Sequence, residues 1–210
     1  MAQRCRKTSN IAQPCGKLQV LHNPPETSTP EMSTSIHQKT LMNKHQQPTT
    51  HPTKRILFVC LGNICRSPAA ERIMRHLVEL RGMAHLFDID SAGIGGWHVG
   101  QLPDARMRRH GARHGYDFCS RARQFCTADF DRFDLIVGMD EENMYDLRRK
   151  ARSDADREKL TCMADYLRHH PGQQTVPDPY YGGESDFELV IELLEDACEE
   201  LLEEMIHFKI

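Results

Sequence analysis

A chain of 210 residues with a formal net charge of −3 is long enough for one substantial domain and an appendage. Residues 54–210 carry 21 basic and 28 acidic residues, which argues against a general nucleic-acid-binding protein. No apolar run reaches the length of a secretory signal or a transmembrane helix, so we expect no membrane partner.

The first 53 residues form a polar appendage. They contain no Phe, Trp or Tyr but hold six of the eleven prolines. Such a stretch cannot bury enough apolar surface to offset its ordering entropy, so we expect a disordered N-terminal tail over residues 1–53. A linker, a targeting segment and a mis-assigned start codon each fit this composition.

The eight cysteines are scattered, with two of them in the tail, and do not form a disulfide framework. No Cys or His cluster has the spacing of a zinc site. We therefore predict a cytoplasmic protein whose site uses no metal and no cofactor.

From Lys54 onward the hydrophobic pattern alternates between strand and helix. The predicted elements are a strand at 56–59, a helix from Ser67-Pro68 to Gly82, a strand at 87–92, a glycine-rich loop at 93–100, a helix opening at Pro103-Asp104, a strand at 134–139, a helix after Asp140, a weaker strand at 161–164 and a long C-terminal helix. This order predicts an α/β fold. We expect a single three-layer domain over residues 54–210, with a four-stranded, mostly parallel sheet and helices on both faces.

The stretch Val59–Pro68 has the pattern of an anion site. A buried strand is followed by a short loop and by Ser67-Pro68, residue types that are favoured at the start of a helix. Such a loop directs backbone N–H groups at one point. In a parallel sheet, ligands bind at the carboxyl ends of the strands, which is where this loop is expected.

The chemistry of the loop differs from that of a nucleotide-binding loop, because it lacks Lys and begins with a cysteine. Cys60, five intervening residues and Arg66-Ser67 form the signature of cysteine-dependent phosphatases. A helix N-terminus and a guanidinium favour a thiolate, the nucleophilic form of cysteine. Arg66 offers a planar fork to two phosphate oxygens, and Ser67 can donate a hydrogen bond to the sulfur. A buried structural cysteine beside a surface arginine is the alternative interpretation.

Attack on a phosphate ester also requires a proton donor for the departing oxygen. Asp178 is the candidate, since prolines restrain the backbone around it and glycines downstream allow the loop to turn. The adjacent Tyr180 and Tyr181 are expected to form walls for a flat aromatic leaving group. Taken alone, Asp178 fits the start of a turn equally well.

Three segments resemble, in the same order, the landmarks of the low-molecular-weight protein tyrosine phosphatase family: Val59–Pro68, Met139–Asn143 and Asp178–Gly182. The resemblance covers about Lys54 to Ile206 and leaves the tail outside. It implies a protein-tyrosine-phosphatase in which Cys60 forms a phosphocysteine intermediate, Arg66 binds the phosphoryl group and Asp178 acts as general acid and base.

The resemblance also assigns expected roles to neighbouring residues. The loop and its support comprise Leu61, Gly62, Asn63, Ile64, Cys65, Ser67 and Ser91, and the substrate walls comprise Trp97, Tyr180 and Tyr181 together with Leu61 and Ile64. Cys65 would pair with Cys60 under oxidation and so protect it. One departure from the family concerns Ser120, which stands about where some members carry a His. Support for the loop is therefore expected to differ here.

Two other functions fit parts of the pattern. An arsenate reductase of the same fold would use further cysteines as a relay, for which Cys119 and Cys126 are candidates. A non-catalytic phosphotyrosine-binding module would need only the arginine and the loop amides. The complete set of nucleophile, arginine and acid favours an enzyme, which we expect to be a monomer acting on a phosphotyrosine-bearing protein or a small aryl phosphate.

Overall fold

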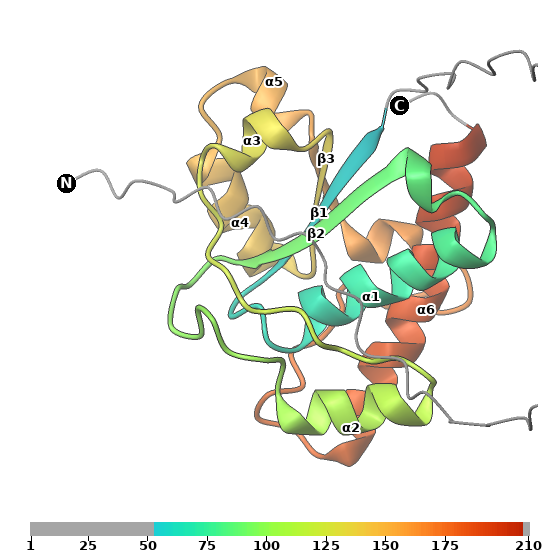
Figure 1. Ribbon diagram of the computed structural model, residues 1–210. Coiled ribbons are helices and arrows are strands. Elements are labelled where there is room, and N and C mark those ends of the chain that lie inside the picture. The colour runs from blue at the N-terminus through green and yellow to red at the C-terminus, as the bar shows by residue number, and fades with distance from the viewer. Residues whose placement is uncertain (1–52, 208–210) are drawn as a thin grey trace, which may run out of the picture. The chain divides into compact units, whose positions relative to one another are not determined.

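The computed structural model describes residues 53–207, so all but the last residue of the expected tail lies outside the described residues. The sheet has the order β2-β1-β3-β4, and each neighbouring pair of strands is parallel (Figure 1). The strands are β1 (Lys54–Cys60), β2 (Phe87–Gly93), β3 (Leu135–Gly138) and β4 (Leu160–Cys162). The helices are α1 (Arg66–Leu80), α2 (Ala105–Arg113), α3 (Asp129–Arg132), α4 (Glu141–Lys150), α5 (Asp154–Arg157) and α6 (Glu184–His207), with short 3-10 turns at Ala84–Leu86 and Met163–Tyr166.

The inner strand β1 separates two cores, because successive side chains of a strand point to opposite faces of the sheet. Ile56 and Phe58 pack in the cluster that includes residues of α1 and α6. Leu57 and Val59 pack in the cluster that includes residues of α3 and α4. Figure 1 shows α1 and α6 together on one side of the strands and α3 and α4 on the other. The predicted α/β fold, with a parallel sheet and helices on both faces, is confirmed.

Helix α1 starts directly after the loop that follows β1. Its N-cap is Cys65, and no side chain caps the first turn. The prediction that Ser67 caps the helix is wrong, since Ser67 is already the second helical residue. Its hydroxyl lies 3.1 Å from the sulfur of Cys60 and 3.2 Å from the carbonyl oxygen of Ala92. The residue that favoured a cap in the sequence is therefore used in the loop.

The end of α1 follows the prediction. Gly82 has a φ of 67°, the left-handed conformation that glycine adopts without steric cost. The N–H of Gly82 donates to the carbonyl of Glu79 and that of Met83 donates to the carbonyl of Val78, at 3.1 and 2.8 Å. These two bonds form a Schellman motif, which satisfies carbonyls at the helix end.

The other predicted strands and helices are present at the expected places except for the length of β4, whereas the short helices α3 and α5 were not predicted. Asp104 and Asp140 cap α2 and α4, each accepting a hydrogen bond from a backbone N–H of the first turn. The expected strand at 161–164 is shorter, because the chain turns into a 3-10 helix at Met163. Over residues 53–207, no helix is both long enough and apolar enough to cross a membrane.

Candidate active site

The candidate anion loop, residues 60–66, connects the carboxyl end of β1 to α1. Most of it is inaccessible to solvent: Cys60, Asn63 and Arg66 are each only 2 % exposed. Asn63 has a φ of 56°, a left-handed conformation that Asn tolerates better than most residues. The approach of β2 to this loop requires a glycine. A Cβ on Gly93 would lie 3.0 Å or less from backbone atoms of the loop.

The sulfur of Cys60 is held at the floor of this loop by two polar groups. The backbone N–H of Asn63 donates to it at 3.3 Å. The hydroxyl oxygen of Ser67 lies 3.1 Å away. Both groups can donate a hydrogen bond to the sulfur, which lies next to the start of α1.

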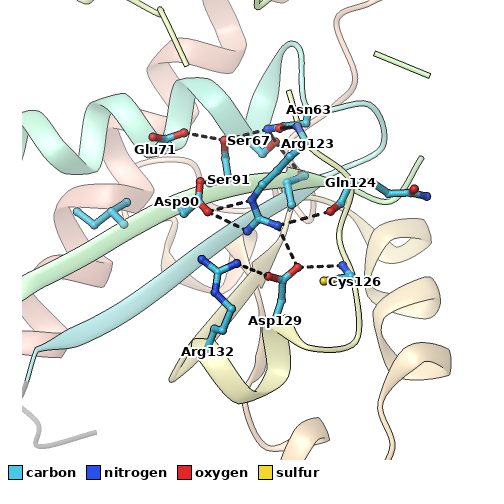
Figure 2. Close-up of polar contacts among 12 residues, drawn as sticks. Asn63, Ser67, Glu71, Asp90, Ser91, Arg123, Gln124, Cys126, Asp129 and Arg132 are labelled. Atoms are coloured by element: carbon cyan, nitrogen blue, oxygen red, sulfur yellow. Dashed lines mark hydrogen bonds and ion pairs between the residues drawn. The ribbon is translucent and has the colours of Figure 1, made fainter. Parts of the chain in front are cut away.

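A hydrogen-bond network behind the loop contains the predicted support residues (Figure 2). The side-chain amide of Asn63 donates to the hydroxyls of Ser67 and Ser91, both at 2.9 Å. The hydroxyl of Ser91 donates in turn to the carboxylate of Glu71 at 2.7 Å. The structure thus brings Asn63, Ser67 and Ser91 together, as expected, and adds Glu71 on α1.

Glu71 gives the network a direction, because a carboxylate only accepts hydrogen bonds. Ser91 donates its single hydroxyl proton to Glu71, so its oxygen must accept the hydrogen bond from Asn63. Ser67 also accepts from Asn63, so its own proton is available for the sulfur of Cys60 or the carbonyl of Ala92. Burial raises the pKa of Glu71, while the nearby charge of Arg75 and the hydrogen bond from Ser91 lower it in part.

Ser120 is not part of this support. Among the described residues, the network hydrogen bonds come from the groups named above and from Arg123, whose backbone N–H donates to the side-chain oxygen of Asn63 at 2.9 Å. This chain has Ser120 about where some family members are expected to carry a His. The hydrogen bond to Asn63 comes instead from Arg123, three residues further along the chain.

Arg66 is a buried cation between two carboxylates. Its Nη1 atom donates to Asp140 and its Nη2 atom to Asp178, both at 2.5 Å, and Nη1 also reaches the carbonyl of Val176 at 3.2 Å. Burial lowers the pKa of the guanidinium, but the charges of Cys60, Asp178 and Asp140 more than offset it, and the net pKa is raised. Nε of Arg66 is buried and has no hydrogen-bond partner within residues 53–207.

Asp178 comes from the loop before α6 and meets Arg66 across the site. Its side chain is 38 % exposed, so it borders the solvent. Its other carboxylate oxygen accepts a hydrogen bond from the N–H of Tyr180 at 3.1 Å. This bond closes a turn, in agreement with the turn that the Asp-Pro pair also predicts. The N–H of Val176 donates to the carbonyl of Met139 and ties this loop to the end of β3.

The predicted substrate walls are mostly exposed apolar side chains. Trp97 is 69 % exposed and Tyr181 96 %, whereas Leu61 and Tyr180 are about 40 % exposed. The two tyrosine rings meet edge to face, with their centroids 5.0 Å apart. The segment that leads to Trp97 is bonded to the anion loop, since the N–H groups of residues 94 and 95 donate to the carbonyls of Cys60 and Leu61.

Ile64 differs from this group. It is 8 % exposed and belongs to the core cluster beneath the sheet, so its side chain packs inward. Cys65 is also buried, at 4 % exposure. Burial is the main cause that raises the pKa of its thiol, and the charge of Cys60 adds to it.

The model of one family, the low molecular weight phosphotyrosine protein phosphatases, matches residues 55–208. The chain belongs to this family. A low molecular weight protein-tyrosine-phosphatase of Streptomyces coelicolor is 45 % identical over 151 residues, which are 71 % of this chain and 92 % of that protein. The expected family and enzyme class, a protein-tyrosine-phosphatase, are confirmed.

Two solved phosphatase structures extend the comparison. A protein tyrosine phosphatase from Entamoeba histolytica superposes with a TM-score of 0.72 at 41 % identity, covering 75 % of this chain and all of that one. DARP, an arginine phosphatase of Drosophila, superposes with a TM-score of 0.67 at 32 % identity, covering 71 % of this chain and 96 % of that one. The family fold thus includes proteins named for different phosphorylated residues.

Asp140 is a site residue whose role was not predicted from the sequence, although its segment is a family landmark. A sequence signal exists, because Asp140 follows a buried strand and the carboxyl ends of parallel strands lie at one edge of the sheet. In the described part of this phosphatase, no group of three or more His, Cys, Asp or Glu side chains is arranged to hold a metal ion.

Proposed function

We propose that this phosphatase hydrolyses phosphotyrosine in proteins, or small aryl phosphates, in two steps at Cys60. In the first step the thiolate attacks phosphorus, the bond to the aryl oxygen breaks, and Asp178 transfers its proton to that oxygen. In the second step the Asp178 carboxylate takes a proton from water, which attacks phosphorus. The phosphorus–sulfur bond then breaks, releasing inorganic phosphate and the thiolate.

The observation that carries this proposal is the convergence of Cys60 and Arg66, at the two ends of one loop, with Asp178 from a distant part of the chain. Cys60 ends β1, Arg66 starts α1, and Asp178 reaches Arg66 from the loop before α6. A structural cysteine would need neither a buried arginine nor an acid at its mouth. A binding module would need only the arginine and the loop amides.

Arg66 is suited to hold the phosphoryl group in both steps. It is buried and fixed by Asp140 and by the carbonyl of Val176. Among the described residues, its Nε atom has no hydrogen-bond partner and its Nη2 atom bonds only to Asp178, so these two donors form a fork for two phosphate oxygens. The reaction as proposed uses no metal and no cofactor, because the thiolate is the nucleophile and the guanidinium supplies the positive charge.

We assign the aromatic walls to Trp97, Tyr180 and Tyr181, with Leu61. Their exposure near the loop and Asp178 supports this assignment, since a buried aromatic ring would not reach a substrate. Such walls suit a flat aryl leaving group better than the small oxyanion of an arsenate reductase. The relatives compared above are likewise phosphatases.

We also propose that Cys65 protects Cys60 from oxidation. Peroxide would convert the thiolate to a sulfenic acid, and the sulfur of Cys65 would then displace water to form a disulfide. Cys65 is buried within the same loop, which supports a local reaction. Mass spectrometry after brief peroxide treatment should find Cys60 linked to Cys65, and finding only sulfinic Cys60 would refute the pairing.

Further proposals concern the chain as a whole. We infer a catalytic domain over residues 54–210 and an N-terminal tail that stands outside it, and the start of the family match at residue 55 supports this boundary. We also infer a cytoplasmic monomer without nucleic-acid or membrane partners. The acidic composition of the domain and the scattered spacing of the cysteines, which has no disulfide-framework pattern, support this inference.

The test is a panel of matched peptides carrying phosphotyrosine, phosphoserine or phosphoarginine, with para-nitrophenyl phosphate and arsenate as further substrates. Wild-type protein should hydrolyse phosphotyrosine and para-nitrophenyl phosphate fastest, and Cys60→Ser should lose turnover yet still bind phosphate. A preference for the phosphoarginine peptide would show that the proposed substrate class is wrong. Thiol-dependent turnover of arsenate would do the same. Turnover by Cys60→Ser would refute the mechanism.

A further inference from the structure

Residues 121–126 cross the carboxyl end of β2 beside the anion loop (Figure 2). The N–H of Gly93 donates to the carbonyl of Arg123 at 2.9 Å, and the N–H of Phe125 donates to the carbonyl of Gly93 at 2.8 Å. A parallel bridge joins Gly93 to Gln124. This segment therefore lies against the strand end that contacts the loop backbone.

The backbone N–H of Arg123 fixes the orientation of the Asn63 amide. It donates to the side-chain oxygen of Asn63 at 2.9 Å, so the amide nitrogen must face the hydroxyls of Ser67 and Ser91. If the amide turned over, it would present N–H groups to the Arg123 N–H and an oxygen to Ser67. The proton of Ser67 would then be drawn to that oxygen and away from Cys60.

The side chain of Arg123 holds this backbone in place. Its Nε donates to Asp90 at 2.9 Å, and its Nη1 donates to Asp129 at 3.0 Å. Asp90 precedes Ser91 in β2, whereas Asp129 opens α3 and is completely buried. Asp129 also accepts from the backbone N–H of Cys126, so one carboxylate holds both the side chain of Arg123 and the backbone at the end of the segment.

The positive charge of Arg123 is balanced by the negative charges of Asp90 and Asp129. Burial lowers the pKa of the guanidinium, but the charges of Asp90 and Asp129 raise it further, so Arg123 remains a cation. Loss of this cation would leave a buried carboxylate at Asp129 with weaker compensation, and the segment would move to restore solvation.

We propose that Arg123 is a positioning residue for the phosphatase reaction: clamped between Asp90 and Asp129, it orients Asn63 and thereby keeps the hydroxyl proton of Ser67 available to the sulfur of Cys60. The proposal rests on the proposed function, in which Cys60 is the nucleophile. Arg123 contacts neither the sulfur nor the substrate walls in the described hydrogen bonds, so its effect is indirect. It acts on the reactivity of Cys60 and leaves Arg66 in place.

Arg132 provides a matched control. It pairs with the same Asp129 at 3.3 Å, and its guanidinium lies 5.2 Å from the ring of Phe133, against 5.9 Å for Arg123. Its side chain is 56 % exposed, and no described hydrogen bond links it to Asp90 or to the anion loop. Replacing Arg132 therefore perturbs the same buried carboxylate without the link to Asn63.

The experiment compares Arg123→Lys and Arg132→Lys in the full chain. Lysine keeps the charge but cannot span two carboxylates as a planar fork. We measure kcat and KM for para-nitrophenyl phosphate, the inhibition constant of inorganic phosphate, the pH profile of Cys60 alkylation by iodoacetamide, and the melting temperature. All rates are measured well below the lowest melting temperature.

For Arg123→Lys we expect kcat to fall about tenfold or more, which corresponds to the loss of one directed hydrogen bond to a charged group. The midpoint of Cys60 alkylation should move to higher pH, while phosphate inhibition changes little. Arg132→Lys should alter none of these by more than about twofold. Asp90→Asn weakens the same clamp from its exposed side, should shift alkylation in the same direction, and carries the test if Arg123→Lys does not fold.

A lower melting temperature with unchanged kcat and unchanged alkylation would show that Arg123 is only structural and would overturn the proposal. Equal effects of Arg123→Lys and Arg132→Lys would do the same, because they would trace the loss to Asp129. If the wild type lacked phosphatase activity, the proposed function would fail, and the alkylation profiles would still report whether Arg123 controls Cys60.

Discussion

Nη2 of Arg66 lies 2.5 Å from a carboxylate oxygen of Asp178, so the proposed phosphate-binding group and the proposed acid form an ion pair. The first chemical step needs Asp178 to carry a proton and to face the departing oxygen rather than Arg66. A phosphate dianion offers Arg66 more charge than a carboxylate does. We infer that substrate takes the place of Asp178 on Nη2 and leaves the acid free to face the departing oxygen.

Competition between Asp178 and phosphate predicts opposite effects of Asp178→Ala on binding and turnover. Inorganic phosphate should bind at least as tightly as it does to the wild type, because Arg66 no longer has a competing anion. Turnover of a phosphotyrosine peptide should fall about 10²- to 10⁴-fold, the usual contribution of a general acid. The inhibition constant of phosphate and kcat measure the two effects. Clearly weaker phosphate binding would contradict the competition.

Asp140 is expected to stabilise the fold in two separable ways. It pairs with Arg66, and its other oxygen accepts from the N–H of Asn143 at the start of α4. Asp140→Asn keeps an oxygen for the cap but removes the charge, and we expect a loss of about 1–3 kcal/mol in the free energy of unfolding. Asp140→Ala should lose about 1 kcal/mol more through the missing cap. Urea denaturation measures the free energy of unfolding of both variants. Equal stability of the two variants would refute a separate contribution of the cap.

Asp196 on α6 predicts an acid-dependent loss of stability. It accepts hydrogen bonds from the side chains of His169 and His170 at 2.8 and 2.9 Å and from the backbone N–H of His169. Burial raises the pKa of Asp196, but these bonds outweigh it and lower the pKa from 3.8 to about 2. Because the folded state binds the proton less readily than the unfolded state, the stabilisation is present above about pH 4 and is lost as the pH falls towards about 2.

The corresponding measurement compares Asp196→Asn with the wild type in urea between about pH 6 and pH 3. Allowing for solvent screening near the surface, we expect the substitution to cost about 1–2 kcal/mol at pH 6 and progressively less at lower pH. Asp117→Asn, at an exposed position, is the control and should leave the curve unchanged. A difference that stays constant with pH would show that Asp196 acts through packing rather than charge.

Local patterns in the sequence predicted the main candidate residues of the site and the loop that carries Cys60 and Arg66. A buried strand, a cysteine, an arginine six residues later and the Asp-Pro-Tyr-Tyr segment were each readable because their spacing is short and their chemistry specific. The parallel sheet then placed Cys60 at a strand end. These predictions needed no knowledge of contacts between distant residues.

The remaining parts of the site depend on distant contacts without such spacing. Ser67 is a residue type that often caps helices. Only the fold shows that its hydroxyl contacts the sulfur of Cys60 and accepts a hydrogen bond from Asn63. Glu71 resembles a surface residue of a helix, yet it is buried against Ser91. Arg123 is one of many arginines, and its role depends on Asp129 being fully buried beside it.

The central claim, a phosphocysteine at Cys60, is tested most directly by rapid mixing, acid quenching and mass spectrometry of the peptide that contains Cys60. Asp178→Ala should be mixed with para-nitrophenyl phosphate, whose leaving group needs little protonation, so that the first step proceeds while the second lacks its base. We expect this peptide to carry one phosphoryl group on sulfur shortly after mixing, and no label in Cys60→Ser. Continued turnover with Cys60 unmodified at every time point would contradict the mechanism.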